Sequence, residues 1–365
     1  MQIECLREII LERVSLLQGA IGRNLSLPIL NNVLIKVEDG RIKLSTTNLE
    51  IGMTAWVGGK IEESGEITVP VKILSNILNN VSSEKIVLKS DGNKLTIKGD
   101  NSKIVLKGME GKDFPIIPSI KEGFELKLPA EKVKKAISKT IFSVSVNETR
   151  PELTGIFIDI EDKNVNFVGT DSVRLSKFSI ELNKSPGDPK SVIVPAKTMS
   201  EVLKGIGGYT GDILCKISEN QILFNFNNIT IISRIIEGKY PPYNQVIPNN
   251  FKTKITINNK EFTKALKMAG IFATNRASEI IIKQKDNGKI EISSSAQDLG
   301  ENSSLINADI QGDDIETLTF NFRYLSEGVF VIDDEEIRFS VSGSESPVII
   351  DSEKNDKFLY LMCSI

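Results

Sequence analysis

The residues available for chemistry are carboxylates, lysines and three cysteines, because the chain contains no histidine. The lack of histidine excludes Ser-His-Asp and Cys-His nucleophile systems and histidine-ligated metal sites. Carboxylate and lysine chemistry stay possible, but no pair of carboxylates recurs at metal-ligand spacing. The odd, scattered cysteines, Cys5, Cys215 and Cys363, fit neither a disulfide framework nor a zinc cluster. They favour a reducing cytoplasm, and we expect no cofactor, no metal and no enzymatic activity.

Two short motifs have both a catalytic and a plainer interpretation. The glycine-rich run KGIGGYTGD from Lys204 lacks the strand-to-helix order and the Gly-Lys-Ser/Thr step of a phosphate loop. We interpret it as a turn, with Gly205 at the C-cap of the preceding helix. The acidic run DDEE from Asp333 has the oxygen ligands that a divalent cation needs. Its place between the apolar runs VFVI and IRFSV favours a hairpin turn.

One pattern of short strand, proline or asparagine, and amphipathic helix occurs three times. The copies ITVPVKILSNILNNV, VIVPAKTMSEVLKGI and LTFNFRYLSEGVFVI place Pro70, Pro195 and Asn321 at the same position, 125 and 126 residues apart. A period of this length matches a whole domain. Further markers repeat in phase: the strand-turn segments TTNLEIGM, GTDSVRLS and SSAQDLGE, and the aromatic-proline steps Phe114-Pro115 and Tyr240-Pro241. We therefore predict three similar domains, 1–121, 122–250 and 251–365, with boundaries near Lys121 and Asn250.

Most of the chain has the alternating pattern of antiparallel strands. VLIKVEDGRIKLSTTN, KIVLKSDGNKLTIKGD, GIFIDIEDKNVNFVGTD and EIIIKQKDNGKIEISSS each read as a hairpin broken at a Gly, Asp or Asn turn. About two helices interrupt each repeat, at Leu6–Arg23, Lys72–Val81, Glu131–Val144, Lys197–Ile206, Asn259–Gly270 and Phe322–Phe330. The predicted fold class is α+β, with antiparallel sheets and two helices in each of three repeated domains.

Positive charge is concentrated on the predicted helices. They contain fourteen lysines and arginines against six acidic residues, although the whole chain has a net charge of −3. If these helices face one way, their surface attracts a polyanion through contacts that depend on salt and not on base sequence. The plainer interpretation is that lysines solvate the helix surfaces.

The composition is that of an ordinary globular protein, with 40% hydrophobic and 25% charged residues. Apolar runs stay below the ~18 residues that a membrane span needs. The N-terminal stretch carries charges that a signal peptide does not tolerate. These features predict a cytoplasmic location and no membrane partner.

The chain resembles the family of the bacterial DNA polymerase III beta subunit, the replicative sliding clamp. The resemblance spans the whole length and rests on LPILNNVLIKV, TVPVKILSNIL, TRPELTGIFIDI, GTDSVRLS, SVIVPAKTMSEVL, EGKYPPYNQVIP, FNFRYLSEG and SPVIIDS, all in family order. It implies three DNA-clamp domains that dimerise head to tail into a six-domain ring around duplex DNA. The implied partners are a second copy of the chain, double-stranded DNA, and polymerase subunits, the clamp loader and repair proteins that bind through short peptides.

The resemblance also implies the residues of three surfaces. The peptide-binding pocket would comprise Leu153, Thr170, Ser172, Val173, Arg174, Leu175, Pro241, Val246, Ser346, Pro347 and Met362. The DNA-facing positions that match the family are Lys72, Arg150, Lys197 and Lys204, and Arg23 stands beside a position that is commonly arginine. To these we add, from the predicted helix faces, Lys132, Lys135, Lys264 and Lys267. The dimer interface would place Ile104 against Ile271 and Phe272 of the second copy.

Some positions depart from the family pattern. The chain ends in LMCSI, with Ser364 where the family often has arginine, and Val173 stands where relatives often have a larger polar residue. Asn24 and Ala196 replace common arginines. Two other functions fit parts of the sequence: a repeat-built interaction scaffold without DNA binding, and a carboxylate-dependent nuclease or phosphatase that uses a divalent metal.

Overall fold

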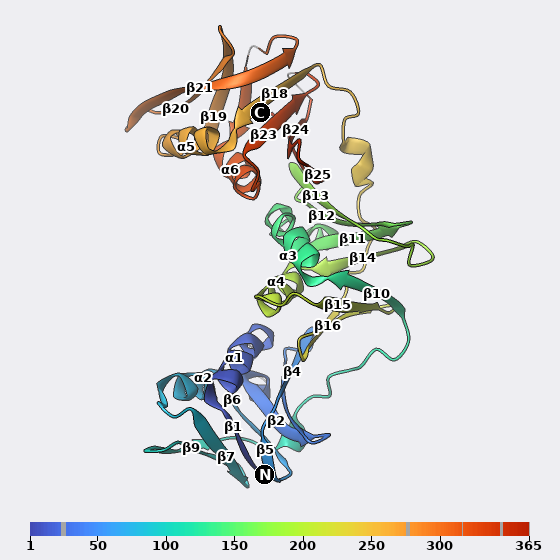
Figure 1. Ribbon diagram of the computed structural model, residues 1–365, viewed down its shortest axis with the longest axis vertical. Helices are drawn as coiled ribbons and strands as arrows, with labels where there is room; N and C mark the ends of the chain where they lie inside the picture. The colour runs from blue at the N-terminus through green and yellow to red at the C-terminus, as the bar shows by residue number, and fades with distance from the viewer. Residues whose placement is uncertain (23–26, 275–277, 316, 344–345, 365) are drawn as a thin grey trace. The chain divides into compact units, whose positions relative to one another are not determined.

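The computed structural model describes the whole chain except residues 23–26, 275–277, 316, 344–345 and 365. The described residues form two compact units (Figure 1). Unit 1 comprises Met1–Lys134 and Lys197–Ile235, and unit 2 comprises Lys135–Ala196 and Ile236–Ile365. The middle repeat therefore contributes strands to both units. The domain boundaries near Lys121 and Asn250 stay a prediction, because this division follows compactness and not the repeat.

Six α-helices lie in the described part of the chain, and 3-10 turns follow two of them. The helices are α1 (Arg7–Leu17), α2 (Val71–Asn80), α3 (Ala130–Ser138), α4 (Ala196–Ile206), α5 (Asn259–Gly270) and α6 (Phe322–Phe330). The bounds of α5 and α6 are those predicted. Both begin after an asparagine N-cap: the side-chain oxygens of Asn258 and Asn321 accept backbone hydrogen bonds, each at 3.1 Å, from Glu261 and Tyr324.

Two helices end earlier than the sequence predicts. The apolar spacing extends the first to Arg23, but α1 ends at Leu17 and a 3-10 turn follows at Gln18–Ala20, where Gly19 disfavours further helix. The same spacing extends the third to Val144, but α3 ends at Ser138. There the Thr140 hydroxyl donates to the Ala136 carbonyl at 2.6 Å, and the chain continues as a 3-10 turn.

Unit 1 contains two antiparallel sheets. The first has the order β5-β1-β7-β8-β9 and the second the order β10-β15-β16-β17-β4-β3-β2-β6. The strands of the first repeat are β1 (Gln2–Leu6), β2 (Asn32–Glu38), β3 (Arg41–Thr47), β4 (Ile51–Val57), β5 (Lys60–Glu63), β6 (Glu66–Pro70), β7 (Lys85–Asp91), β8 (Lys94–Lys98) and β9 (Lys103–Lys107). The middle repeat adds β10 (Phe124–Pro129), β15 (Asp212–Ile217), β16 (Gln221–Phe226) and β17 (Ile229–Arg234). Because β17 pairs with β4, the second sheet runs without a break from one repeat into the next.

The described strands of unit 2 form one antiparallel sheet of order β14-β11-β12-β13-β25-β24-β23-β18-β21-β20-β19-β22. The middle repeat supplies β11 (Gly155–Glu161), β12 (Asn164–Thr170), β13 (Arg174–Glu181) and β14 (Lys190–Pro195). The third repeat supplies β18 (Thr253–Asn258), β19 (Glu279–Lys285), β20 (Lys289–Ala296), β21 (Gly300–Gly312), β22 (Leu318–Asn321), β23 (Glu336–Val341), β24 (Val348–Ser352) and β25 (Asn355–Met362). Here β13 pairs with β25, which again joins two repeats edge to edge.

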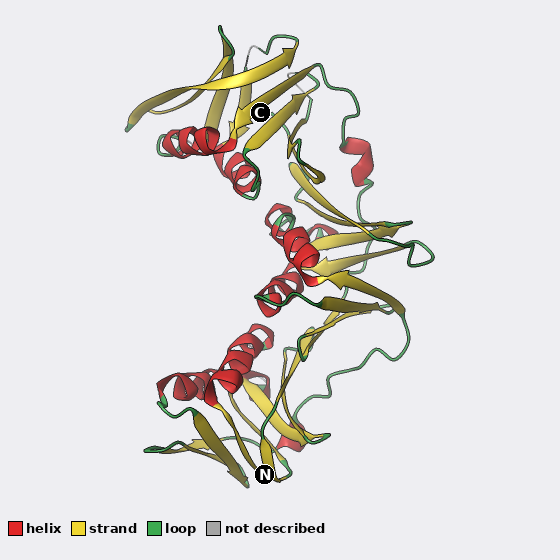
Figure 2. Ribbon diagram, viewed as in Figure 1, coloured by secondary structure: helices red, strands yellow, loops and turns green. Residues whose placement is uncertain are grey.

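The helices cover the sheets with their apolar faces. Figure 2 shows α1 with α2 against the strands of unit 1, and α5 with α6 against those of unit 2. Leu17 of α1 and Leu74 of α2 are fully buried, as are Leu266 of α5 and Leu325 of α6. The predicted α+β class with antiparallel sheets is confirmed. None of the described helices is long and apolar enough to cross a membrane.

The four predicted hairpins are confirmed as β2-β3, β7-β8, β11-β12 and β19-β20. The glycine-rich run is a turn, as predicted, but Gly205 lies inside α4. The glycine that ends the helix is Gly207, whose φ of +49° suits glycine. The DDEE run is not a hairpin turn, because the VFVI run before it belongs partly to α6, so DDEE joins a helix to β23.

Candidate functional site

The middle and third repeats meet in unit 2 around a cluster of buried side chains. Its members come from neighbouring strands, from the 3-10 turn Pro151–Leu153 and from the segment after β17: Leu153, Val168, Leu175, Ile193, Tyr240, Tyr243, Ile349 and Leu361. Phe157 stacks on Tyr240 with ring centroids 4.4 Å apart, and the Tyr243 hydroxyl donates to Asp159 at 2.9 Å. The aromatic-proline segment is therefore fixed on the sheet by stacking and by one charge-assisted hydrogen bond.

The eleven positions of the predicted peptide pocket lie around this cluster. Leu153, Leu175 and Met362 are buried, and Thr170 pairs with Leu175 across β12 and β13. Met362 pairs with Arg174 on one side and with Val348, the residue after Ser346 and Pro347, on the other. The exposed positions are Ser172, Val173 and Val246, with Pro241, Ser346 and Pro347 half-buried. The arrangement is a buried apolar floor with a partly exposed rim.

Arg174 is the most constrained residue of this group. Its side chain is only 5% exposed, and its guanidinium donates to Asp171 at 3.0 Å, to the Phe142 carbonyl at 2.7 Å and to Glu327 of α6. It also lies over the Tyr324 ring, 4.3 Å from the centroid. Burial lowers the pKa of this guanidinium, but the bonds and charges, with Glu327 first, outweigh burial and raise it. Arg174 therefore ties the middle repeat to α6, and each of its three side-chain nitrogens donates a hydrogen bond in this structure.

Several residues of the junction are not evident from the sequence. Its patterns do not assign Tyr240, Tyr243, Phe157 or Glu327 to the pocket, although EGKYPPY stands out as a repeat marker. The aromatic spacing within that segment is the available signal for the two tyrosines. No local pattern connects Glu327 to Arg174, because 153 residues separate them.

The C-terminal tail is fixed next to this junction. The Ser364 hydroxyl accepts from the Thr319 amide and donates to the Thr319 carbonyl, each at 3.1 Å. Ser364, which departs from the family pattern, therefore holds the tail against β22. Cys363 beside it is exposed.

The predicted DNA-facing residues that the structure describes are all exposed: Lys72, Lys132, Lys135, Arg150, Lys197, Lys204, Lys264 and Lys267. Arg23 lies outside the described residues. Lys204 pairs with Glu201 at 2.8 Å, and Arg150 with Glu152 at 3.0 Å. Within the described part of the chain, the other six have no ion pair, so their charges are available to a polyanion.

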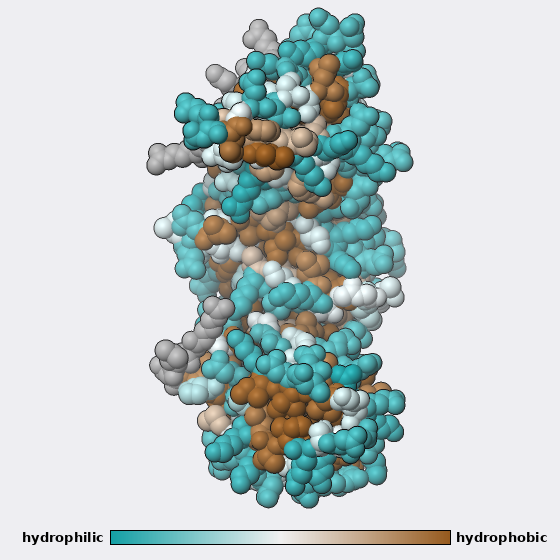
Figure 3. All heavy atoms as spheres, turned by 90° about the vertical axis from the view of Figure 1, so that its left-hand side faces the viewer, coloured by the Kyte–Doolittle hydropathy of each residue, from teal (hydrophilic) through white to brown (hydrophobic). Residues whose placement is uncertain are grey.

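The predicted interface residues lie at two partly exposed apolar positions, one on a strand at a sheet edge and one after a helix. Ile104 is on β9, a terminal strand of its sheet, and lines a cavity of about 720 Å³ with Ile73 and Ile77. Figure 3 shows a hydrophobic area over α2 and β9 in the lower part of the view. Ile271, directly after α5, is 56% exposed, and Phe272 beside it is half-buried.

The buried thiols are protonated, and the acidic residues that the structure describes do not cluster as metal ligands. Burial raises the pKa of the Cys5 and Cys215 thiols to about 12, so both stay protonated near neutral pH. Among the described residues, no three or more Cys, Asp or Glu side chains come together as metal ligands. Asp333 of the acidic run instead pairs with Lys139 at 3.6 Å.

Comparison with known proteins gives a consistent result along the chain. Residues 1–118 match the model of the DNA polymerase III beta subunit N-terminal domain, residues 127–242 its central domain, and residues 244–365 its C-terminal domain.

Individual relatives show the same similarity. The chain is 28% identical over 358 residues to a beta sliding clamp of Staphylococcus epidermidis, covering 95% of this chain and 94% of that protein. Its structure is similar to a putative DNA polymerase III beta subunit from Eubacterium rectale, with a TM-score of 0.92 at 29% identity, covering 100% and 99% of the two chains. A sliding clamp from Bacillus subtilis gives a TM-score of 0.94 at 25% identity, with the same coverage. A sliding clamp from Pseudomonas aeruginosa, solved with griselimycin bound, also gives a TM-score of 0.94 at 25% identity, covering 100% of this chain and 99% of that one.

The contacts of Arg174 predict the effect of removing its charge. Arg174→Met leaves Asp171 and Glu327 without their buried partner, so we expect the free energy of unfolding to fall by about 3 kcal/mol. Calorimetry of the full chain measures the change. The control is Arg323→Met, which takes a 75% exposed cation from the same Glu327 and should cost below about 0.5 kcal/mol. Equal losses in the two variants would contradict the role of Arg174.

Proposed function

The chain belongs to the DNA polymerase III beta-subunit family of sliding clamps, and on that basis we propose that two copies close into a ring around duplex DNA. The ring holds the replicative polymerase and other DNA-processing proteins on the template through their short peptide segments. It performs no chemical step itself. The observation that carries the proposal is the set of exposed, unpaired lysines on helices of all three repeats.

The lysines suit a contact that must slide. Lys72 on α2, Lys132 and Lys135 on α3, Lys197 on α4 and Lys264 on α5 present mobile point charges without a fixed geometry. Such charges contact phosphates equally well at every step along the duplex and do not read its bases. The tether is then topological, and weak binding keeps the ring mobile.

The apolar junction of unit 2 suits a short peptide. Exposed Val246 and Val173 supply apolar surface for one or two anchoring side chains, and the buried residues Leu153, Leu175 and Met362 form the apolar floor beneath the site. Peptides commonly bind through a few such anchors in a concave apolar site. Because each side-chain nitrogen of Arg174 already donates a hydrogen bond, the backbone and the rim are the source of polar contacts.

Dimerisation is supported by two strand edges that carry complementary charge. In the described part of the chain, β9 pairs only with β8, and residues 301–306 of β21 pair only with β20. Lys103 and Lys107 lie on the first edge, and Glu301 lies on the second. Antiparallel addition of one edge to the other would satisfy both sets of backbone groups and cover the apolar residues beside them.

Neutralising helix lysines should weaken DNA binding and its dependence on salt. Each phosphate that a variant no longer neutralises lowers the slope of log K against log salt by about 0.9, so a fourfold variant should lower it by about 3 to 4 if each lysine binds one phosphate. Fluorescence anisotropy with short duplex DNA at several salt concentrations measures this for Lys72→Gln, Lys132→Gln, Lys197→Gln and Lys264→Gln combined. The control changes four exposed lysines outside the helices: Lys94, Lys184, Lys239 and Lys283. An unchanged slope in the helix variant would favour the scaffold function.

Replacing Ile271 with Asp and Phe272 with Ala should prevent dimerisation, because a charge would enter the apolar contact. Light scattering at micromolar concentration should give twice 40.3 kDa for the unchanged chain and 40.3 kDa for the variant. Leu49→Asp, at a similarly exposed leucine in a turn of unit 1, is the control and should leave the dimer intact. A dimer that persists in the first variant would refute the interface assignment.

Peptide binding should depend on the rim of the unit 2 junction. Leu175 is 3% exposed, so Leu175→Asp would disturb the fold, whereas Val246 is 51% exposed and its change to Asp should not. We expect Val246→Asp to weaken a peptide with Leu and Phe anchors at least tenfold in a calorimetric titration. The control is Ile116→Asp, on the corresponding linker of unit 1, where the side chain is 94% exposed. Equal affinity for all three proteins would place the peptide elsewhere.

A further inference from the structure

The two junctions between repeats are related by the internal repeat, so their residues can be compared one to one. In unit 2, Leu175 of β13 pairs with Leu361 of β25. In unit 1, Gly52 of β4 pairs with Ile232 of β17. The residues just before these pairs, Arg174 and Ile51, each begin their strand and hold the same position. The helices α4 in unit 1 and α6 in unit 2 offer a second correspondence.

Each junction contains a glutamate at the equivalent position of its helix. Glu201 stands six residues after Pro195, and Glu327 six residues after Asn321, so they occupy equivalent positions in α4 and α6. In unit 2, Glu327 receives the guanidinium of Arg174. In unit 1 the corresponding residue is Ile51, which has no charge to offer. The first junction has therefore kept the glutamate without the equivalent arginine.

Glu201 is left with one unpaired oxygen. The residue is 5% exposed, and its Oε1 accepts from Lys204 at 2.8 Å. Its Oε2 is buried and has no hydrogen-bond partner among the described residues, and the same holds for Nε of Arg13 nearby. A Cβ on Gly19 would collide with the Glu201 carboxylate, so glycine makes room for it. A buried carboxylate oxygen without a partner costs free energy unless something else pairs with it.

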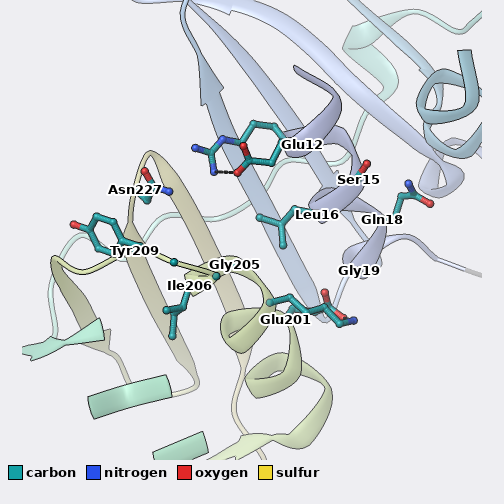
Figure 4. A pocket seen from close by; sticks show the side chains of 14 residues that line it. Glu12, Ser15, Leu16, Gln18, Gly19, Glu201, Gly205, Ile206, Tyr209 and Asn227 are labelled. Carbon is teal, nitrogen blue, oxygen red and sulfur yellow. Dashed lines mark hydrogen bonds and ion pairs between the residues drawn. The ribbon is translucent and has the colours of Figure 1, made fainter. Parts of the chain in front are cut away.

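A cavity of about 630 Å³ adjoins this carboxylate. Residues of α1, α4, the turn after α4 and the β16-β17 turn line it, with Glu12, Ser15 and Asn227 among its polar groups. In Figure 4, Glu201 and Gly19 lie at one end of the cavity, and Tyr209 and Asn227 lie at the other. The space is large enough for an extended side chain whose charged end reaches Glu201.

We propose that this cavity binds a guanidinium group from outside the chain on Glu201, in the place that Arg174 fills at the second junction. A guanidinium suits the site because its planar array of N–H donors matches a carboxylate with two parallel hydrogen bonds. Lys204 does not prevent this, because its side chain is 63% exposed and its ammonium bonds to Oε1, while Oε2 stays unpaired within the described part of the chain. The site is separate from the proposed peptide, DNA and dimer surfaces, except that Lys204 also belongs to the DNA-facing set.

Two sources would supply this group: a small guanidinium compound, or an arginine side chain of a partner protein. Calorimetric titrations of the full chain with agmatine, and with a short peptide that has one arginine among small residues, distinguish them. The matched control peptide carries citrulline, which has the shape of arginine without its charge. Saturable binding of agmatine alone would indicate a small molecule, and tighter binding of the arginine peptide would indicate a partner segment.

Two single substitutions test the contact with Glu201. Glu201→Gln should weaken the bound probe at least tenfold, because the charge-assisted hydrogen bonds lose their charge. Glu12→Gln changes a carboxylate that lines the same cavity but is 63% exposed, and it should alter binding less than threefold. Equal loss in both variants would show a diffuse attraction of cations and overturn the proposal.

Ile51→Arg supplies the missing guanidinium from within the chain. If the two junctions are equivalent, Arg at this position pairs with Glu201, abolishes binding of the probe and raises the melting temperature. Glu327→Gln is the opposite control, because that glutamate already has its arginine, and it should leave probe binding unchanged. Should neither agmatine nor the arginine peptide bind the unchanged chain at millimolar concentration, the cavity holds water only and the proposal is wrong.

Discussion

Antiparallel strand pairing between repeats is the interaction on which the rest of the structure depends. A strand at the end of a sheet exposes unpaired N–H and C=O groups, which attract any other strand. The chain resolves this by adding the edge of one repeat to the next, β17 to β4 in unit 1 and β25 to β13 in unit 2. The proposed peptide site and the guanidinium cavity lie beside these junctions, and the proposed dimer surfaces lie beside edges left open.

The segments between repeats cover other edges. Met109 forms a bridge with Thr68 of β6, and Ile236 forms the corresponding bridge with Ile193 of β14. Both residues precede the Glu-Gly-Lys turn that marks the end of a repeat in the sequence. These turns therefore close a sheet edge as well as lead into the next repeat. In unit 2 the same segment also carries Tyr240 and Tyr243 into the apolar junction.

The two junctions between repeats share a backbone arrangement and differ in side-chain chemistry. At the second junction, Arg174 joins a strand, a 3-10 turn and a helix in one hydrogen-bonded network, and aromatic rings pack beside it. At the first junction, an isoleucine holds the equivalent position, and a polar cavity lies beside a half-satisfied glutamate. Backbone pairing tolerates this divergence because strand hydrogen bonds do not depend on side chains. The two junctions of one fold thus differ in the side chains that surround them.

Local patterns are sufficient for the elements and for the outline of the site. Gly, Asp and Asn turns between alternating strands identify the hairpins, and Asn258 and Asn321 mark the starts of α5 and α6. The position of Leu153 and Leu175 in the floor is predictable because both lie in segments that match the family, TRPELTG and GTDSVRLS. The predicted ends of α1 and α3 are wrong, since apolar spacing continues past them while Gly19 and Thr140 stop the helix.

The sequence by itself determined the threefold repeat, the antiparallel α+β fold and the concentration of lysines on helices, because each can be inferred from residue spacing and composition. Only the tertiary structure decided which strand edges join, that Arg174 donates to Glu327, and that Glu201 keeps an unpaired oxygen beside a cavity. The physical reason is that these facts depend on contacts between residues far apart in the chain. Their energies arise from burial and hydrogen-bond geometry, which no local pattern encodes.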